Sequence, residues 1–458
     1  MENRKQHHHV LAIPYPTQGH INPMLQFFKR LVSKNLKTTL AITKFHFNST
    51  HPPPSINSIS IDTISDGFDD AGYSQASDSQ SYLETFQIAG SKTLLDLISR
   101  HQTAGNPIDC VVYDSFIPWV FDVVKPLGIK TASFFTQPCA VNFLYYNVSI
   151  GKIPVGSSVD APVTSIPGLP LLTVDDLPPF VSEPEVYVPY RDMVFGQFRN
   201  VVEADFVFVN TFYELEEEVV NEMSKYSPLI TIGPTIPSFY LDKRVENDND
   251  YGLNLFESDP STTIQWLSSK PKGSVVYVSF GSLSDLGGGQ MEEILWGLKG
   301  SEFNFLWVIR ATEMPKFPDS FVNSEKGLVV GWCPQLEVLA NDAVGCFFSH
   351  AGWNSTIEAM SLGVPMVVMP QWTDQPMNAK LAEDVWKVAI RVRLNEKGIV
   401  GRDEVERCVR EVMDGESGKE MKMMALKWRD LAKEAIDEGG SSDINIDNFI
   451  KKLSDLKN

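Results

Sequence analysis

The stretch from 344 to 375 constrains the fold of this chain most, because two buried strands and a helix follow one another in it without a long loop. The apolar runs 344–348 and 364–369 are typical of strands in a parallel sheet. Between them, after the short turn Ser349-His350-Ala351-Gly352, apolar residues recur at helical spacing. The pattern predicts strand, turn, helix and strand, which is the repeating unit of an α/β fold.

The start of this predicted helix has the groups that a phosphorylated ligand needs. First-turn amides of a helix have no partners within the helix and lie at the positive end of its dipole, which favours an anion. His350, Asn354 and Ser355 add side-chain donors at the same end. One turn further on, Glu358 can accept hydrogen bonds from hydroxyl groups, and the polar loop 371–375 follows the second strand. Together these groups indicate a site for a nucleotide that carries a sugar.

Residues 332–375 resemble, at nearly every position, the signature box of the plant family 1 UDP-sugar glycosyltransferases. One departure is Ala351, where many relatives carry Cys, a side chain that the reaction does not need. The resemblance implies a GT-B fold: two facing Rossmann-like domains with parallel sheets, and a C-terminal helix that crosses back to the first domain. The UDP-sugar contacts that it implies are Trp332 stacked on uracil, Cys333 beside it, Gln335 near the ribose or base, Glu358 on the ribose hydroxyls, His350, Gly352, Asn354 and Ser355 at the diphosphate, and Trp353, Asp374 and Gln375 around the sugar.

Length and composition set wide limits on the rest. The chain has 458 residues, enough for two or three domains with a full core. Its formal net charge of −19 argues against a nucleic-acid partner. Five scattered cysteines without CxxC spacing fit a reduced compartment better than a disulfide framework. The N-terminus lacks the apolar core of a signal peptide, and no apolar run has the length to cross a membrane. We expect a cytoplasmic monomer that does not insert into membranes.

Strands and helices alternate in both halves, and the alternation restarts after a polar, turn-rich stretch at 237–257. We predict an N-terminal acceptor-binding domain at 1–240, a linker at 241–258, a UDP-sugar-binding domain at 259–437, and a C-terminal helix at 438–458 that packs back on the N-terminal domain. Strands are predicted at 10–15, 36–43, 108–113, 131–135 and 207–211, and again at 274–280, 303–309, 328–330, 344–348, 364–369 and 385–392.

A candidate base and its partner come from the first half. His20 lies where a strand leads into a helix, the place at which open α/β sheets bind their ligands. The positive end of that helix favours a neutral, proton-accepting imidazole. Asp114 follows another buried strand and can orient a histidine base. The resemblance puts the catalytic pair on His20 and Asp114, places Gly19 in the same motif, and implies that Thr136 contacts the donor sugar.

Two short motifs of polar residues remain. The turn Gly281-Ser282 ends a predicted strand, and its amide and hydroxyl can approach a phosphate. Asp248-Asn249-Asp250 is a DxD of the type that some sugar transferases use for a metal, but it lies in a charge-mixed stretch with no neighbouring apolar strand to hold it. We therefore expect no metal and no cofactor beyond UDP-glucose as co-substrate.

The acceptor site has the weakest sequence signal of the predicted sites. The proline-, glycine- and serine-rich stretch 151–190 either shapes a pocket or packs as a surface loop, and the sequence leaves both alternatives open. An apolar acceptor cavity is predicted from Tyr82, Phe116, Trp119, Phe143, Tyr145, Phe180, Met193 and Trp372, each of which also suits a core.

Several functions compete for this pattern. An NAD(P)-dependent reductase would need a glycine-rich fingerprint near the first strand, and a Ser-His-Asp hydrolase would need a serine elbow; the chain has neither. We predict an inverting glucosyltransferase that moves glucose from UDP-glucose to a hydroxyl of an apolar plant small molecule (a steroid, triterpenoid or phenolic). The glucose preference rests on the resemblance at Gln375. Two alternatives stay open: glucose ester formation on a small carboxylic acid, and a non-catalytic nucleotide-sugar binding protein.

Overall fold

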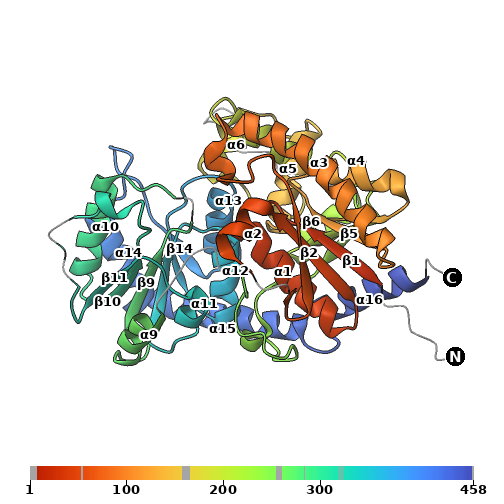
Figure 1. Cartoon of the computed structure of the whole chain (residues 1–458). Coiled ribbons are helices and arrows are strands. Elements are labelled where there is room, and N and C mark those ends of the chain that lie inside the picture. The colour runs from red at the N-terminus through yellow and green to blue at the C-terminus, as the bar shows by residue number, and fades with distance from the viewer. Residues whose placement is uncertain are drawn as a thin grey trace. The chain divides into compact units, whose positions relative to one another are not determined.

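The computed structural model describes residues 8–52, 55–156, 166–253, 260–282, 284–318, 321 and 323–455. The chain forms two compact units, each with its own sheet (Figure 1). Within the described ranges, no helix is both long and apolar enough to span a bilayer. Unit 1 comprises Met1–Leu171, Pro179–Leu255 and Lys433–Asn458, and unit 2 comprises Leu172–Pro178 and Phe256–Ala432.

Unit 1 is built on a sheet in the order β3-β4-β2-β1-β5-β6-β7-β8, parallel except for the β3–β4 pair. The order reverses at β1, which lies between β2 and β5. Ligands of open α/β sheets bind beyond the strand ends at such a point. The strands are β1 (His9–Ile13), β2 (Lys37–Thr43), β3 (Ser55–Ile56), β4 (Ile59–Ile64), β5 (Cys110–Asp114), β6 (Lys130–Phe135), β7 (Phe206–Val209) and β8 (Leu229–Thr231).

Helices cover both faces of this sheet. Alternate residues of β1, such as Val10 and Ala12, join α1 and α16 in one buried apolar cluster, which includes Phe28 and Phe449. Figure 1 shows α3 and α4 together beyond the other face. The helices of unit 1 are α1 (Gln18–Ser33), α2 (Lys44–Thr50), α3 (Ser79–Thr103), α4 (Trp119–Val124), α5 (Cys139–Ser149), α6 (Pro179–Ser182), α7 (Val188–Gly196), α8 (Glu217–Met223) and α16 (Ser441–Asp455), with short 3-10 turns η1 (Gly72–Gln75), η2 (Lys125–Leu127), η4 (Tyr213–Leu215) and η5 (Ser238–Tyr240).

Unit 2 repeats the plan with an all-parallel sheet in the order β11-β10-β9-β12-β13-β14. Its order reverses at β9, which pairs with both β10 and β12, so the ends of β9 and β12 mark its ligand position. The strands are β9 (Val275–Ser279), β10 (Asn304–Val308), β11 (Gly327–Val330), β12 (Val344–Ser349), β13 (Met366–Val368) and β14 (Ala389–Arg391).

One buried apolar cluster holds the sheet of unit 2 to α10 and α14, with Val278 and Phe348 from the strands against Ile294 and Val409 from the helices. The helices of unit 2 are α9 (Pro260–Ser268), α10 (Gly288–Gly300), α11 (Gln335–Leu339), α12 (Trp353–Leu362), α13 (Gln375–Lys380) and α14 (Arg402–Asp414), with the 3-10 turns η3 (Val174–Asp176) and η6 (Met314–Lys316) and the π-helical turn η7 (Leu381–Val385).

The predicted α/β fold with two parallel-sheet Rossmann-like units is confirmed. Helix α15 (Glu416–Ile436) runs from unit 2 into unit 1, where α16 packs on the sheet. The Ser442 hydroxyl donates to the carbonyl oxygen of Gly233 over 2.6 Å, and the Asn445 amide donates to that of Thr231 over 2.9 Å.

The segment predicted as a linker, 241–258, packs inside unit 1 as far as Leu253; residues 254–258 lie outside the described residues. Lys29 reaches the Asp248 carboxylate at 2.7 Å, and both side chains are buried. Arg30 forms a two-pronged pair with Asp242, with both N–O distances at 2.8 Å. Two acidic residues of this polar, turn-rich stretch are thus partners of two α1 cations.

Two further differences come from tertiary contacts. The predicted strand 385–392 is shorter, because η7 takes up its start and only Ala389–Arg391 pairs with β13. Residues 172–178, predicted within the first domain, pack in unit 2. There the buried Asp176 carboxylate accepts from the Arg391 guanidinium at 2.9 Å and lies 3.5 Å from Lys380 Nζ. No local pattern in 172–178 indicates these partners.

Candidate active site

The predicted base and its orienting acid are hydrogen-bonded in unit 1. His20 Nδ1 lies 2.7 Å from Asp114 Oδ2. The pair forms because β1 and β5 are neighbouring parallel strands, with Ile13 opposite Tyr113, so both residues emerge at the same sheet edge. The other oxygen of Asp114 accepts from the Phe116 amide at 3.0 Å, which fixes the carboxylate. This leaves His20 Nε2 as the ring nitrogen that can take a proton from a substrate.

Three side chains frame the His20 ring. Thr136, which follows β6, lies with its hydroxyl 3.3 Å from His20 Nδ1. Phe116 packs on the imidazole with ring centroids 4.8 Å apart, and Tyr15 contacts its edge at 5.4 Å. Burial raises the pKa of Tyr15 far above its usual range, so its hydroxyl stays protonated. The sequence predicted Thr136 and Phe116 for this unit, but Tyr15 looked like a strand residue and was missed.

In unit 2, the strand–turn–helix predicted at 344–362 is present as β12, the turn 350–352 and α12. Gly352 caps α12 in an extended conformation, so the amides of Trp353, Asn354 and Ser355 form the first turn. Such amides have no carbonyl acceptor within their helix and suit an anion. The indole of Trp353 is buried against Trp386 at 5.7 Å, so its backbone amide is the group at the helix start.

His350 lies between two glycines, one from each strand end at the reversal point of the sheet. A Cβ on Gly281, after β9, would lie 2.6 Å from His350 Nε2, and one on Gly352 would lie 2.4 Å from the same atom. Gly281 also has φ +78°, a conformation that favours glycine. Burial lowers the pKa of His350 to about 4, so the imidazole is neutral near pH 7 and carries one N–H donor. The requirement for two glycines was missed, because it arises between strands.

Three predicted nucleotide residues form one hydrogen-bonded group beside α12. Gln335 Nε2 donates to Glu358 Oε2 at 2.6 Å and to the Ser355 hydroxyl at 3.1 Å. Gln335 Oε1 accepts from the Tyr277 hydroxyl at 3.1 Å, and the Cys333 thiol lies 3.5 Å from the same hydroxyl. The group orients Glu358 toward the start of the helix, where a ribose would lie if the diphosphate occupies the first turn. Tyr277, on β9, was missed by the sequence analysis.

The loop after β13 is held by its own polar side chains. Gln375 Oε1 accepts from the amides of Gln371 and Trp372 at 2.9 and 3.1 Å, which leaves its amide nitrogen as the group that can bind a sugar hydroxyl. The Asp374 carboxylate accepts from Asn378 Nδ2 and the Thr373 hydroxyl, both at 2.7 Å. Asn378 also donates to the carbonyl oxygen of Ala351 at 2.9 Å, so it joins this loop to the turn before α12. Asn378 was missed as well.

The remaining predicted donor residues lie at the edges of these groups. Ser282 is exposed after Gly281, and its carbonyl oxygen accepts from Arg310 at 2.7 Å. Trp332 is half-buried before Cys333, and Gly19 is half-buried in the first turn of α1 in unit 1. All of the predicted donor residues lie in unit 2 except Gly19 and Thr136, which belong to unit 1 with His20.

The residues predicted for an acceptor cavity lie in both units. Seven lie in unit 1 and Trp372 lies in unit 2. Phe116 contacts His20, and Tyr145 contacts Phe180 at 6.5 Å. Of the other four residues in unit 1, Tyr82 and Trp119 both pack on Phe86, and the Tyr82 hydroxyl donates to Asp66. Phe143 packs on Tyr226, and Met193 is half-buried on α7.

Several known proteins are similar to this chain in sequence and in fold. A family model described as UDP-glucoronosyl and UDP-glucosyl transferase matches residues 240–432. UDP-glycosyltransferase 74F2 of Arabidopsis thaliana is 53% identical over 97% of this chain and 98% of its own length. Flavonol 7-O-beta-glucosyltransferase UGT74F1 of the same plant is 51% identical over the same shares. Mogroside I-E synthase of Siraitia grosvenorii is 45% identical, again over 97% and 98%.

Among solved structures, the chain is similar to Os79 from O. sativa in complex with UDP. The TM-score is 0.91 and the identity 41%, with 97% of this chain and all of that one covered (100%). A second Os79 structure, in complex with U2F and trichothecene, has a TM-score of 0.88 at 40% identity, over 97% and 100% of the two chains.

Proposed function

We propose that this chain, which belongs to the UDP-glucoronosyl and UDP-glucosyl transferase family in its plant branch, transfers glucose from UDP-glucose to a hydroxyl group of a flat, apolar small molecule. The enzyme class is that of a UDP-glycosyltransferase acting on small molecules. The donor sugar, the acceptor class, the residue roles and the inverting course are the parts that we propose. The observation that carries the proposal is the 2.7 Å hydrogen bond between His20 and Asp114.

The proposed reaction is a single in-line displacement. His20 Nε2 takes the proton of the acceptor hydroxyl while that oxygen forms a bond to the anomeric carbon of glucose. The bond between the anomeric carbon and the β-phosphate oxygen breaks, and its electron pair leaves on UDP. Attack on the face opposite the leaving group inverts the anomeric centre. Asp114 orients the imidazole and stabilises its protonated form, so the acid–base part of the reaction lies in unit 1.

The departing UDP gains negative charge, which hydrogen-bond donors of unit 2 stabilise. The first-turn amides of α12 and the His350 N–H supply donors that are already oriented before the reaction, so little reorganisation accompanies bond breaking. Glu358 accepts from the ribose hydroxyls and Trp332 stacks on uracil in this proposal. Gln375 Nε2 binds glucose hydroxyls, because its Oε1 is occupied by two loop amides.

The acceptor is proposed to be hydroxylated, flat and apolar. Aromatic rings that flank His20, such as Phe116 and Tyr15, suit such a molecule. One relative is a flavonol 7-O-beta-glucosyltransferase, which supports a hydroxyl group of such a molecule as the acceptor. The second candidate function is glucose ester formation on a small carboxylic acid, which uses the same donor site but has no proton for His20 to remove.

The acceptor proposal is tested by incubating the protein with UDP-glucose and a panel of flavonoids, triterpenes, steroids and aromatic acids. We expect glucosides of hydroxyl groups among the products, identified by mass spectrometry and NMR. Transfer restricted to carboxylic acids would replace the proposal by the ester alternative. Binding of UDP-glucose without any transfer would favour a nucleotide-sugar binding protein.

We also propose that transfer needs no metal ion. The Asp248 carboxylate of the DxD sequence is engaged within unit 1: it accepts from Lys29 Nζ at 2.7 Å and from the Ser238 amide at 2.6 Å. We expect EDTA to leave the rate unchanged. Asp248→Ala should lower the melting temperature, because it leaves the buried Lys29 charge unpaired, at a cost of about 3–5 kcal/mol. Loss of activity with EDTA that magnesium restores would contradict this.

Five free, buried cysteines and the strongly negative net charge support a cytoplasmic enzyme without nucleic-acid partners, which we propose to act as a monomer.

A further inference from the structure

An arginine of unit 2, Arg310, joins two loops through backbone carbonyl groups. It lies two residues after β10, and its side chain is 27% exposed. Its guanidinium donates to the carbonyl oxygen of Ser282 over 2.7 Å and also to that of Ser284. Because a guanidinium group is planar and rigid, its nitrogens can hold two acceptors at once in a fixed geometry.

The strand order of unit 2 explains why these carbonyl groups are its partners. β9 and β10 are neighbouring parallel strands, with Val278 opposite Trp307, so their carboxyl ends lie at the same edge of the sheet. Arg310 follows one strand, and the loop with its two acceptors follows the other. The Ser284 hydroxyl also donates to the carbonyl oxygen of Phe280, which closes this loop on itself. Arg310 therefore joins a compact loop to the end of β10.

The start of this loop lies at the proposed diphosphate site. The backbone of Gly281 is so close to His350 that a Cβ on the glycine would lie 2.6 Å from Nε2. Ser282 comes next, and it is exposed. The turn Gly281-Ser282 is thus held at one residue by its contact with the imidazole and at the next by the Arg310 guanidinium.

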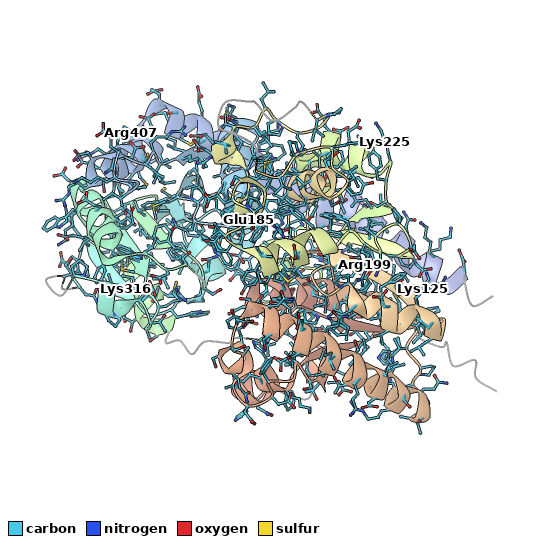
Figure 2. All side chains as sticks on the ribbon, turned by 90° about the horizontal axis from the view of Figure 1, so that it is seen from above. Lys125, Glu185, Arg199, Lys225, Lys316 and Arg407 are labelled. Atoms are coloured by element: carbon cyan, nitrogen blue, oxygen red, sulfur yellow. The ribbon has the colours of Figure 1, made fainter. Side chains whose placement is uncertain are left out.

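The hydrogen bonds of Arg310 to described residues go to carbonyl oxygens and not to a carboxylate. The acid that pairs with it is Glu313, whose Oε1 lies 3.8 Å from the guanidinium and 3.2 Å from Lys316 Nζ. Lys316, which Figure 2 shows at the edge of unit 2, also binds Asp285 of the same loop. Because hydrogen bonds from a charged donor are stronger than neutral ones, Arg310 holds the loop firmly and places a positive charge beside it.

We propose that Arg310 is a positioning residue of the diphosphate site: its guanidinium holds the turn Gly281-Ser282 where the amide and hydroxyl of Ser282 donate to a phosphate of UDP. This inference rests on the proposed function and adds a cation behind the groups that stabilise the departing UDP. Donors that are oriented before the reaction need little reorganisation as charge develops, and a turn that has to be ordered on binding lowers affinity. Arg310 acts through the turn, so its role is one of position.

The test compares the binding of UDP and of uridine to wild type, Arg310→Leu and Arg310→Lys, with no acceptor present. Uridine has no phosphate, so its affinity does not depend on the turn. We expect Arg310→Leu to bind UDP about 10–100-fold more weakly than wild type, and uridine with an unchanged Kd. Arg310→Lys keeps the charge but lacks the planar fork, and should bind UDP about 3–10-fold more weakly. Calorimetry measures UDP, and NMR titration measures the weaker binding of uridine.

Arg407→Leu is the matched control, because it removes another arginine of unit 2 that is engaged within the protein. Arg407 forms a two-pronged pair with Glu404 on α14, with both N–O distances at 2.8 Å. Figure 2 shows Arg407 well apart from Lys316. This variant should bind UDP and uridine as wild type does. Circular dichroism checks that each variant is folded; if Arg310→Leu is not, Arg310→Lys carries the comparison.

The outcomes separate this inference from the proposed function. If wild type binds UDP more tightly than uridine and both Arg310 variants keep this difference in full, Arg310 does not position the turn, and only the inference is wrong. Loss of UDP and uridine affinity by the same factor would also contradict it, because Arg310 would then stabilise unit 2 as a whole. If wild type binds UDP no more tightly than uridine, the proposed diphosphate site itself is wrong.

Discussion

Replacing His20 by alanine is expected to lower the rate of glucose transfer to a hydroxyl acceptor by about 10²–10⁴-fold, while UDP binds as tightly as to wild type. The rate falls because the acceptor proton has no oriented base. UDP affinity stays because the groups that we propose to bind the nucleotide belong to unit 2, whereas His20 belongs to unit 1. Steady-state kinetics and calorimetric titration with UDP measure the two quantities separately.

The matched control is His101→Ala. His101 Nε2 also lies near a carboxylate of unit 1, at 3.3 Å from Asp62, but at the end of α3 rather than beside the predicted site. Its loss should leave kcat unchanged. A carboxylate acceptor gives a second check: it is already ionised near pH 7, so ester formation should suffer far less from His20→Ala than transfer to a hydroxyl. Full turnover of hydroxyl acceptors by His20→Ala would remove His20 from the mechanism.

Gly352→Ala should weaken UDP binding by about 10–100-fold, which corresponds to the loss of one or two charge-assisted hydrogen bonds. The backbone at Gly352 has φ −62° and ψ 143°, which alanine adopts without strain. The effect is purely steric: the new Cβ would lie 2.4 Å from His350 Nε2. The imidazole cannot simply move away, because the backbone of Gly281 lies against the same ring atom. Either the ring or the first turn of α12 must shift.

Gly287→Ala is the control for this steric effect. Gly287 caps α10 in nearly the same conformation, with φ −62° and ψ 150°, and a Cβ there meets nothing within 4 Å. Like Gly352→Ala, this substitution replaces a glycine that caps a helix, but the new Cβ causes no clash. UDP should therefore bind to Gly287→Ala as it does to wild type. Calorimetry with UDP measures both variants. Equal, wild-type affinity in Gly352→Ala would show that the His350 position is not needed for the diphosphate.

Most of the proposed donor half of the site is local in sequence, so its residues could be grouped from the sequence. The turn Ser349–Gly352, the first-turn amides of α12 and the Glu358 side chain follow one another directly, and helix geometry alone groups them. The residues that hold these groups in place could not be predicted in the same way, because they come from distant parts of the chain. Tyr277 reaches Gln335 from 58 residues away, and Gly281 meets His350 only because β9 and β12 are paired.

The proposed catalytic pair could be predicted from the sequence only in part. His20 and Asp114 are 94 residues apart, and each could be placed at the end of a strand from its own surroundings. Their contact depends on β1 and β5 being neighbours, which no local pattern states. The acceptor residues could not be predicted reliably from the sequence, because each predicted aromatic side chain suits a core as well as a pocket. Arg310, whose carbonyl partners lie 28 and 26 residues away in the chain, had no sequence signal.

The sequence by itself determined most of the elements of this protein, because apolar periodicity sets strands and helices, and it supplied the polar residues at their ends to which we assign the binding of a UDP-sugar and an acceptor. Only the tertiary structure decided which of these ends meet. It paired His20 with Asp114, seated His350 between two glycines, bound 172–178 into unit 2 through Asp176, and joined Arg310 to the loop after β9. The physical reason is that local periodicity depends on neighbours within a few residues, whereas strand order and side-chain partners depend on packing between segments that are far apart in the chain.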